Sequence, residues 1–313
     1  MKKNPHKILV TGSNGFVGSE LCQGLRATDY ACTGSIRDSK KAITGQEHVV
    51  VETLDSSTDW RAALAGCDTV IHLAGRAHVL TENVSDPSSI FREINTLGTL
   101  NLAEQAAELG ISRFIFLSSI AVNGAFTSGL PFTPNDPPFP HSPYAMSKLE
   151  AEIGLRKLSK RSNLEVVIIR APAVYGKNAP GNFRLLAQFI RYGIPLPVGS
   201  ICNRRSLVSI KNLVSFIVLC IEHQKVENKL FIVSDNEDLS TVEVVKLMGK
   251  FVGKKPRIIK FSLILLRFIF KCLGKQKVGQ SLMEDLQVDS DLCEELLGWS
   301  PPFSPKAFIK SLD

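Results

Sequence analysis

The chain has 313 residues, 44% of them hydrophobic and 21% charged, which excludes a disordered or fibrous protein and allows one large domain or two smaller ones. Its seven cysteines are scattered and include no Cys-x-x-Cys pair, so we expect neither a disulfide framework nor a structural zinc site, and we expect a reducing compartment. The formal net charge of +7 leaves a nucleic acid or an anionic membrane surface open as a partner.

The first 172 residues alternate short apolar runs with helical hydrophobic patterns. The predicted strands are residues 7–11, 31–36, 48–54, 69–74, 113–117 and 165–170. The predicted helices are residues 16–26, 59–65, 89–108 and 143–159. Strands that are buried on both sides read as continuous apolar runs, so this alternation predicts an α/β fold with a parallel sheet covered by helices on both faces.

The pattern loosens after residue 172, where glycine and proline become frequent. Further helices are predicted at residues 183–192, 211–223, 241–252 and 263–273, and short strands at 207–210 and 229–233. We expect residues 1–172 to form the sheet domain and residues 173–313 to form mainly a smaller C-terminal lobe, with segments that return to the sheet. The longest apolar run, residues 261–270, is half the ~20 residues of a membrane-spanning helix, so a cytoplasmic protein is expected.

A glycine-rich turn joins the first predicted strand to the first predicted helix. It reads Thr11-Gly12-Ser13-Asn14-Gly15-Phe16-Val17-Gly18. Gly12 permits a tight turn, Gly15 lets the backbone approach a pyrophosphate, and Gly18 lets the helix pack closely on the strand. The N–H groups at the start of the helix, around Asn14, Phe16 and Val17, favour phosphate. The turn therefore predicts dinucleotide binding by a Rossmann-type doubly wound sheet.

The end of the second predicted strand bears on the choice of cofactor. An acidic residue usually binds the adenosine ribose there, yet Ile36 occupies that position and Arg37 follows it. A guanidinium suits the 2′-phosphate of NADP(H). Asp38, one residue further, could bind the ribose instead and restore NAD(H). The residues lean toward NADP(H) and leave NAD(H) open.

Tyr144 and Lys148 lie four residues apart and share one face of a predicted helix. A phenol with a pKa near 10 is a poor acid–base catalyst at neutral pH. The ammonium of Lys148 and the positive charge of a nicotinamide are expected to lower the pKa of Tyr144, and Lys148 can also hold the nicotinamide ribose. The fifth strand leads into Ser118-Ser119 at the edge where such sheets bind ligands, and a serine there can relay a proton with the tyrosine.

These motifs, in this order, resemble the extended short-chain dehydrogenase/reductases of the NAD-dependent epimerase/dehydratase family, over nearly the whole chain. The resemblance assigns the catalytic serine to Ser119 and leaves Ser118 as a neighbouring structural donor. It implies further cofactor contacts at Leu54 and Asp55 beside the adenine, at Leu73, Ala74 and Gly75 in the turn beneath the cofactor, and at Asn95, which supports the site.

The resemblance also implies a UDP-sugar substrate and a homodimer. Asn182 and Arg205 match residues that contact the diphosphate, for which a guanidinium fork is suited. A second diphosphate arginine of many members has no counterpart in residues 279–288. The dimer of the family implies contacts around residues 97–108 and 150–158.

Three reactions use this catalytic set. A 4,6-dehydratase needs an Asp-Glu pair after the catalytic serine, and Ile120-Ala121 stand there instead. The remaining reactions are those of a 4-ketoreductase and a 4-epimerase. The whole-chain pattern resembles bacterial enzymes of surface-polysaccharide (O-antigen or capsule) biosynthesis. Arg37 and an exchangeable NADP(H) favour a UDP-4-keto-6-deoxy-N-acetylhexosamine 4-reductase, with a UDP-glucose or UDP-N-acetylglucosamine 4-epimerase as the alternative.

Two other classes of function remain to be compared. A catalytically dead cofactor-binding regulator would not need the intact set of Ser119, Tyr144 and Lys148. Nucleic-acid binding is not expected, because no basic motif interleaved with aromatic residues accompanies the high pI. Residues 250–277 carry nine basic side chains and no acidic one around the apolar run 261–270. That pattern suits a lobe helix packed on the core, or weak association with an anionic membrane surface.

Overall fold

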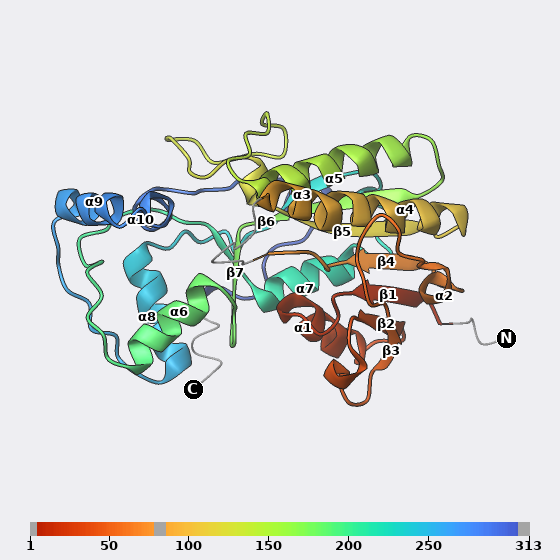
Figure 1. The fold of residues 1–313 in the computed structure, drawn as a ribbon, viewed down its shortest axis with the longest axis horizontal. Helices are drawn as coiled ribbons and strands as arrows, with labels where there is room; N and C mark the ends of the chain where they lie inside the picture. Colours follow the sequence, from red (N-terminus) through yellow and green to blue (C-terminus); the bar gives the residue numbers. More distant parts are fainter. Residues whose placement is uncertain (1–4, 78–85, 306–313) are drawn as a thin grey trace.

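The computed structural model describes residues 5–77 and 86–305 (Figure 1). Within these ranges seven parallel strands form one sheet in the order β3-β2-β1-β4-β5-β6-β9. The strands are β1 (Lys7–Thr11), β2 (Ala31–Ile36), β3 (Glu47–Val50), β4 (Thr69–His72), β5 (Arg113–Ser119), β6 (Glu165–Ala171) and β9 (Leu230–Ile232). The strand order reverses between β1 and β4, the position where doubly wound sheets bind ligands. The predicted Rossmann-type fold is confirmed.

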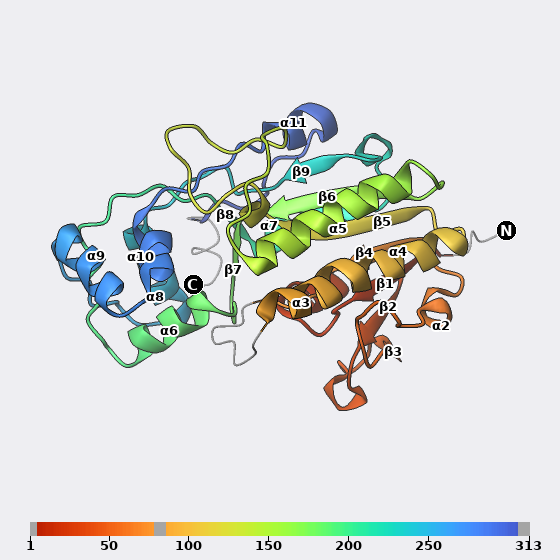
Figure 2. The same ribbon diagram turned by 45° about the horizontal axis from the view of Figure 1, so that its top comes forward.

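Helices cover both faces of this sheet, as the apolar strands require. One face packs against α1 (Phe16–Leu25), α7 (Ile210–Leu219) and α11 (Asp291–Leu297). The other packs against α2 (Arg61–Leu64), α4 (Gly98–Glu108) and α5 (Pro143–Ser159). Figures 1 and 2 show α4 and α5 side by side on their face of the sheet. The strands are therefore buried between two apolar layers.

A smaller lobe extends beyond the carboxyl ends of the strands, at the left of Figure 1. It contains α6 (Asn182–Arg191), α8 (Thr241–Val252), α9 (Leu263–Cys272) and α10 (Gln276–Met283), and a short parallel pair formed by β7 (Ala173–Tyr175) and β8 (Leu207–Ser209). Its separate core includes Ile190, Leu196, Val245 and Leu266. The chain returns to the main body through α7, β9 and α11. That this lobe binds the substrate stays a prediction.

The predicted helix over 89–108 is divided into three parts. It begins as α3 (Pro87–Phe91), continues through a π-helical turn (Arg92–Leu97) and ends as α4. Asp86 sets the start, because its carboxylate accepts the N–H groups of Ser88 and Ser89. π-Helical turns are rare and often occur at functional sites. This one carries Asn95, which the periodicity alone could not have shown.

No helix in the described part of the chain is both long and apolar enough to cross a membrane. All seven cysteines are free thiols, and three of them are buried. The structure therefore stabilises its fold through packing and polar contacts rather than through disulfide bonds.

A buried ion pair joins α5 to the sheet. Arg170 on β6 donates from Nε and Nη2 to the two carboxylate oxygens of Glu152 on α5, at 3.0 and 2.6 Å. The two side chains are only 4% and 2% exposed. Ser118 donates to the same carboxylate at 2.5 Å, and Arg170 also donates to Asn123 at 2.9 Å. Because these hydrogen bonds satisfy the charges, the pair is tolerated in the interior and holds α5 in one position.

Glu152→Ala should lower the free energy of unfolding by ~3–5 kcal/mol, because it leaves the buried guanidinium of Arg170 without a counter-charge. Equilibrium unfolding in urea measures this loss. The matched control is Glu104→Ala, which removes an ion pair with Arg161 in which both side chains are at least half exposed. The control should cost less than ~1 kcal/mol. Similar losses in the two variants would contradict the role given to the buried pair.

Candidate active site

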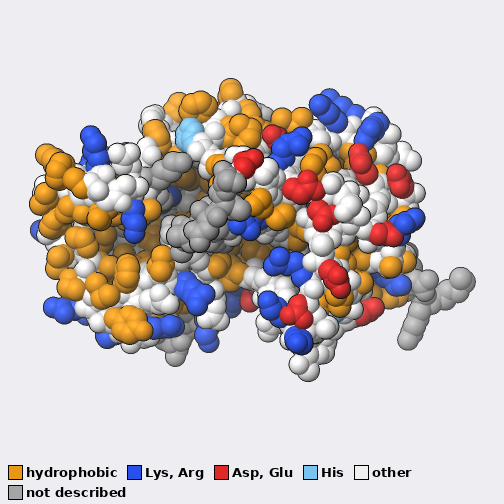
Figure 3. All heavy atoms as spheres, in the orientation of Figure 1, with side chains coloured by type: hydrophobic (Ala, Val, Ile, Leu, Met, Phe, Trp, Pro, Cys, Tyr) orange, Lys and Arg blue, Asp and Glu red, His pale blue; other side chains and the backbone are white. Residues whose placement is uncertain are grey.

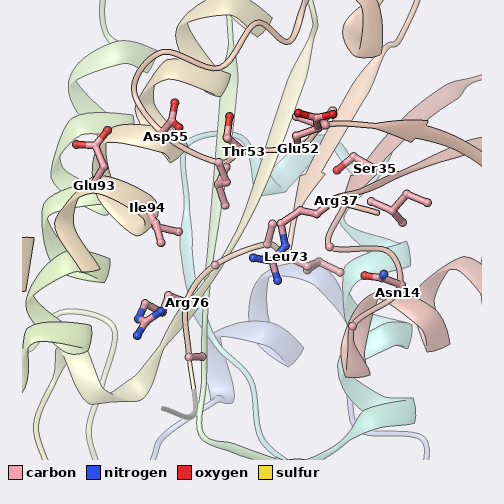
Figure 4. Close-up of a pocket in the computed structure, with 18 of the residues that line it drawn as sticks. Asn14, Ser35, Arg37, Glu52, Thr53, Asp55, Leu73, Arg76, Glu93 and Ile94 are labelled. Carbon is pink, nitrogen blue, oxygen red and sulfur yellow. The ribbon is translucent and has the colours of Figure 1, made fainter. Parts of the chain in front are cut away.

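A cavity of about 720 Å³ opens at the carboxyl ends of β1, β2 and β4 (Figure 4). It brings together residues from Gly12 to Ile94, which lie far apart in the sequence. Half of the predicted site residues line it: Gly12, Asn14, Gly15, Arg37, Leu54, Asp55, Leu73, Ala74 and Gly75. Phe16, Val17 and Gly18 lie just behind it in the first turn of α1. The cavity thus occupies the crevice at which the strand order reverses.

The glycine-rich turn has a geometry that only glycine can fill. Gly12 has a φ of +67°, and a Cβ there would lie 3.0 Å from the Cα of Ala74. A Cβ on Gly18 would lie 2.2 Å from the carbonyl oxygen of Gly12. The start of α1 is therefore pressed against the turn and directs its N–H groups at the cavity. This bare backbone cradle beside a cavity of dinucleotide size fits a bound dinucleotide.

The cavity wall beyond β2, where the adenosine ribose is expected, contains Arg37 and Glu52 and not Asp38. Arg37 extends into the cavity from the end of β2 (Figure 4). The carboxylate of Asp38 instead accepts the N–H of Lys40 at 3.0 Å, so its placement does not support Asp38 as the ribose ligand. Glu52 lines the same wall, because β3 ends at Val50 and the following residues run along the cavity. The predicted strand over residues 48–54 included Glu52, so the sequence did not mark it as a cavity residue.

Asp55 is oriented by its own loop. Its Oδ1 accepts the N–H and the hydroxyl of Ser57 at 2.9 and 2.8 Å and the hydroxyl of Thr58 at 3.1 Å. The bonds from Ser57 are the main cause that lowers the pKa of Asp55. They leave Oδ2 for a ligand such as the predicted adenine amino group. Trp60, which the sequence did not single out, also lines the cavity, and its buried indole N–H has no partner among the described residues.

Ser119, Tyr144 and Lys148 meet at the carboxyl end of β5. Ser119 is the last residue of the strand, and its Oγ accepts the N–H of Ala121 at 3.2 Å, which leaves the hydroxyl proton available to the phenol or a substrate. Tyr144 and Lys148 follow each other on the inner face of α5. The Nζ of Lys148 donates to the carbonyl oxygen of Leu117 at 2.9 Å. The structure thus brings together the three residues that the motifs predicted.

Burial dominates the ionisation of this cluster. It raises the pKa of Tyr144, an effect that the hydroxyl of Ser119 opposes. It lowers the pKa of Lys148 to about 8, which the carboxylate of Glu152 opposes. Without a cofactor, desolvation therefore outweighs the ammonium of Lys148 at this phenol, and the lowering of its pKa by Lys148 together with a nicotinamide stays a prediction. The phenolate depends on a further positive charge brought by a ligand.

Asn95 holds the turn beneath the predicted cofactor site. Its Oδ1 accepts the N–H of Arg76 at 2.7 Å, and its Nδ2 donates to the carbonyl oxygen of Arg76 and to Ser147, both at 3.1 Å. A Cβ on Gly75 would lie 3.0 Å from Asn95 Oδ1. The side chain therefore ties the turn after β4 to α5, next to Lys148. This gives the predicted supporting role a side-chain basis.

His72 supports the same turn from below, and no sequence signal marked it. Its Nδ1 lies 2.7 Å from the hydroxyl of Thr11, and its Nε2 lies 2.9 Å from the hydroxyl of Thr99. The hydroxyl oxygen of Thr11 already accepts the N–H groups of Leu73 and Ala74, so the hydroxyl donates its own proton to Nδ1 of His72. The ring proton therefore sits on Nε2, which donates to the hydroxyl of Thr99. Burial lowers the pKa of His72 to about 3, so the ring is neutral at pH 7.

A second cavity of about 410 Å³ lies between the start of α5 and α10. Ser142 and Ala145 of the α5 turn that carries Tyr144 line it, and Gln280 and Ser281 line it from α10. Arg205 reaches this region, since its Nη1 donates to the carbonyl oxygen of Ser281 at 2.7 Å. Asn182 is exposed at the start of α6 and is absent from the described linings of both cavities.

The comparisons with known proteins agree with this geometry. Residues 8–233 match the model of the NAD dependent epimerase/dehydratase family. The chain belongs to this family. The UDP-glucose 4-epimerase of Vibrio cholerae is 42% identical over 306 residues, which are 96% of this chain and 92% of that protein. The N-acetyl-α-D-glucosaminyl-diphospho-ditrans,octacis-undecaprenol 4-epimerase of Escherichia coli O157:H7 is 29% identical over 255 residues, 79% of this chain and 73% of that protein.

Solved structures share the fold of this epimerase/dehydratase-family chain. MoeE5 in complex with UDP-glucuronic acid and NAD superposes with a TM-score of 0.79 at 21% identity, over 97% of this chain and 96% of that one. The family that the motifs resembled is thus confirmed, and the chain is an NAD-dependent enzyme of the family. Its cofactor fits the glycine cradle and the adjoining cavity described above.

Tyr144→Phe should reduce turnover ~10²–10⁴-fold, because it removes the group that moves the substrate proton. Cofactor affinity should change little, because the substitution alters none of the residues that line the dinucleotide cavity. Steady-state kinetics and calorimetric titration with NAD⁺ measure the two quantities. Tyr30→Phe is the control, because Tyr30 directly precedes the amino end of β2, whereas the cavity lies at the carboxyl ends of the strands. Unchanged turnover of the Tyr144 variant would refute the assignment of the site.

The stability of the protein should fall as the pH drops below about 6.5, the usual pKa of histidine. Between that pH and about 3, the pKa of His72 in the folded chain, the unfolded chain binds one more proton at this residue. Folding therefore loses ~1.4 kcal/mol per pH unit from His72 over this window. His72→Gln should make the dependence shallower by that amount in urea unfolding series at several pH values. An identical slope in the variant would show that His72 is not held neutral.

Proposed function

We propose that this enzyme is a UDP-sugar 4-epimerase that works with NAD(H). The observation that carries the proposal is that the neighbours of Ser119 and Tyr144 reach both cavities, although neither residue is among the described linings. Lys148 lies against Gly75, which lines the dinucleotide cavity, and Ala121, Ser142 and Ala145 line the second cavity. A sugar in the second cavity and a nicotinamide in the first would both reach the hydroxyls of Ser119 and Tyr144. The extent of similarity to the Vibrio cholerae epimerase supports this reaction among those of the family.

The residues of the site would move one proton in each half of the reaction. When bound, the nicotinamide supplies the hydride acceptor, and in its reduced form the hydride donor. Tyr144, as phenolate, takes the proton of the sugar 4-hydroxyl while carbon 4 loses its hydride. Ser119 donates a hydrogen bond to the same oxygen and stabilises it as it becomes a carbonyl. After the sugar rotates within the site, Tyr144 would return the proton to the 4-oxygen while carbon 4 is reduced from its other face.

The same site argues against water elimination. The residues after Ser119 are Ile120, which is 5% exposed, and Ala121, which lines the second cavity. Neither can donate or accept a proton. An elimination needs an acid and a base placed at neighbouring carbons of the sugar. The position where the dehydratases of the family carry a carboxylate pair is therefore apolar here.

The 4-ketoreductase that the sequence favoured depended on an exchangeable NADP(H). Arg37 does extend into the cavity, and it can bind a phosphate oxygen of either cofactor. Glu52 stands in the same wall, where its carboxylate can accept the hydroxyls of an unphosphorylated ribose. The family is NAD-dependent. These points favour NAD(H), and with it an epimerase that retains its cofactor.

We propose that Arg205 binds the diphosphate of the sugar nucleotide. Its Nη1 is held by the carbonyl oxygens of Ser281 and Glu284 at the end of α10, at 2.7 and 3.2 Å. This anchor leaves Nε and Nη2 for phosphate oxygens beside the second cavity. Burial lowers the pKa of Arg205, but a guanidinium remains charged at neutral pH. We propose Asn182, at the start of α6, as a second contact of the diphosphate.

The dimer that the family implies would form through α4 and α5. These helices lie side by side on one face of the molecule. Helix α5 exposes apolar side chains at Met146 and Ile153, each 45% exposed, and Leu109, directly after α4, is 49% exposed. Pairing of this face with a second copy would bury those side chains. It would also stiffen the helix that carries Tyr144.

The purified enzyme should interconvert UDP-glucose and UDP-galactose, or their N-acetylated forms, without added reductant. Chromatography of the sugar nucleotides detects the product, and mass spectrometry of the denatured protein identifies the nucleotide it carries. We expect NAD(H) at close to one molecule per chain, and loss of the conversion in the Tyr144→Phe variant. An empty protein that oxidises NADPH only with a UDP-4-keto-6-deoxy sugar would instead establish the 4-ketoreductase.

A further inference from the structure

The outer end of the lobe exposes an unusual number of apolar side chains. Nineteen large hydrophobic side chains are exposed in the described part of the chain, and twelve of them lie between residues 185 and 278. Figure 3 shows them gathered over the end of the molecule that holds α6, α9 and α10. We call this surface the lobe face. Its exposed apolar residues are Leu185, Phe189, Tyr192, Ile194, Ile259, Leu263, Ile264, Leu265, Phe268, Ile269, Leu273 and Val278.

Helix α9 forms the centre of the lobe face. Leu266 packs in the lobe core and is 5% exposed, so one face of the helix is buried. Ile264 is 83% exposed, Phe268 is 60% exposed, and Leu265 is 48% exposed. Packing on the core therefore explains only part of the apolar run. Exposing so much apolar surface costs free energy unless something covers it.

The charges around this apolar centre have one sign. Residues 181–200 and 250–283 contain eleven lysines and arginines and no aspartate or glutamate. Ten of these cations have described side chains, and all ten are exposed; the side chain of Lys277 lies outside the described part. In Figure 3 the acidic side chains lie over the centre and the other half of the molecule. The lobe face is therefore apolar at its centre and cationic at its rim.

We propose that the lobe face rests on an anionic lipid bilayer. Its apolar side chains would enter the boundary between headgroups and acyl chains, and its lysines and arginines would meet the lipid phosphates. A second copy of the chain fits less well, because pairing two such faces would bring more than twenty cations together, and Arg267 is the one among them whose ion pair, with Glu284, lies in the described part of the chain. A nucleic acid would satisfy the cations and leave the apolar centre uncovered.

This position places the substrate site beside the bilayer. Helix α10 follows α9 directly, and the Arg267 guanidinium on α9 pairs with Glu284 at 2.9 Å, just beyond α10. The same helix α10 lines the second cavity through Gln280 and Ser281. If the enzyme has the proposed function, the sugar nucleotide would therefore enter and leave its cavity close to the lipid surface. This consequence depends on that function, whereas the docking itself does not.

Vesicle flotation tests the docking. The whole protein is mixed with phosphatidylcholine vesicles, with or without about 30% phosphatidylglycerol, at low and high salt. We expect flotation with the anionic vesicles that weakens as salt is raised. The double variant Ile264→Asp/Phe268→Asp should bind at least ~10-fold more weakly, because it removes the apolar centre. Val50→Asp, at an equally apolar site that is 48% exposed on β3, is the control and should bind like the unaltered protein.

Three results would overturn the proposal. The protein could stay with the lipid-free fraction, or the double variant could float as well as the unaltered protein. Sedimentation velocity could also show self-association without lipid that the double variant abolishes, which would assign the face to a second copy. Epimerisation of soluble UDP-sugars is measured in parallel without lipid. Its outcome decides the proposed function separately, because neither Ile264 nor Phe268 lines either cavity.

Discussion

The carboxylate of Glu152 holds the catalytic helix against the sheet, and the geometry of the site depends on that contact. Tyr144, Lys148 and Glu152 follow one another at intervals of four residues on α5, so they share one face of the helix. The ion pair between Glu152 and Arg170 therefore sets the rotation of α5 as well as its distance from β6. Ser118 bonds the same carboxylate and is the neighbour of Ser119 on β5. One buried charge pair thus orients both residues that are predicted to take part in the proton transfer, Tyr144 and Ser119.

The site combines strong burial with few charges of its own. His72 is kept neutral, Lys148 is made less basic, and the pKa of Tyr144 is raised, in each case chiefly by desolvation. In so dry a site a charge brought by a ligand acts with little screening. The phenol would therefore become a proton acceptor mainly when a positive nicotinamide is present. The pKa of the phenol would then depend on the nicotinamide as well as on Lys148.

The positive net charge of the chain is unevenly placed. The cofactor cavity includes the carboxylates of Glu52, Asp55 and Glu93, so the sheet end of the molecule is of mixed charge. The cations without acidic neighbours in the sequence concentrate in the lobe, around apolar side chains that the fold leaves uncovered. The lobe therefore differs from the rest of the surface in both charge and polarity. Its α10 is shared by the second cavity and the lobe face.

The sequence by itself determined the class of fold and the dinucleotide turn, and it predicted Tyr144 and Lys148 as the catalytic pair. Each of these follows from short-range physics: apolar periodicity selects strand or helix, a crowded turn admits only glycine, and a spacing of four places Tyr144 and Lys148 on one face. The tertiary structure alone decided how Asn95 grips the turn at Arg76, why Glu52 rather than Asp38 stands in the cavity wall, and in which direction the pKa of Tyr144 moves. It also decided that α9 is only partly covered. Burial, ionisation and exposure depend on segments that are distant in the sequence, and no local pattern encodes which of them will meet.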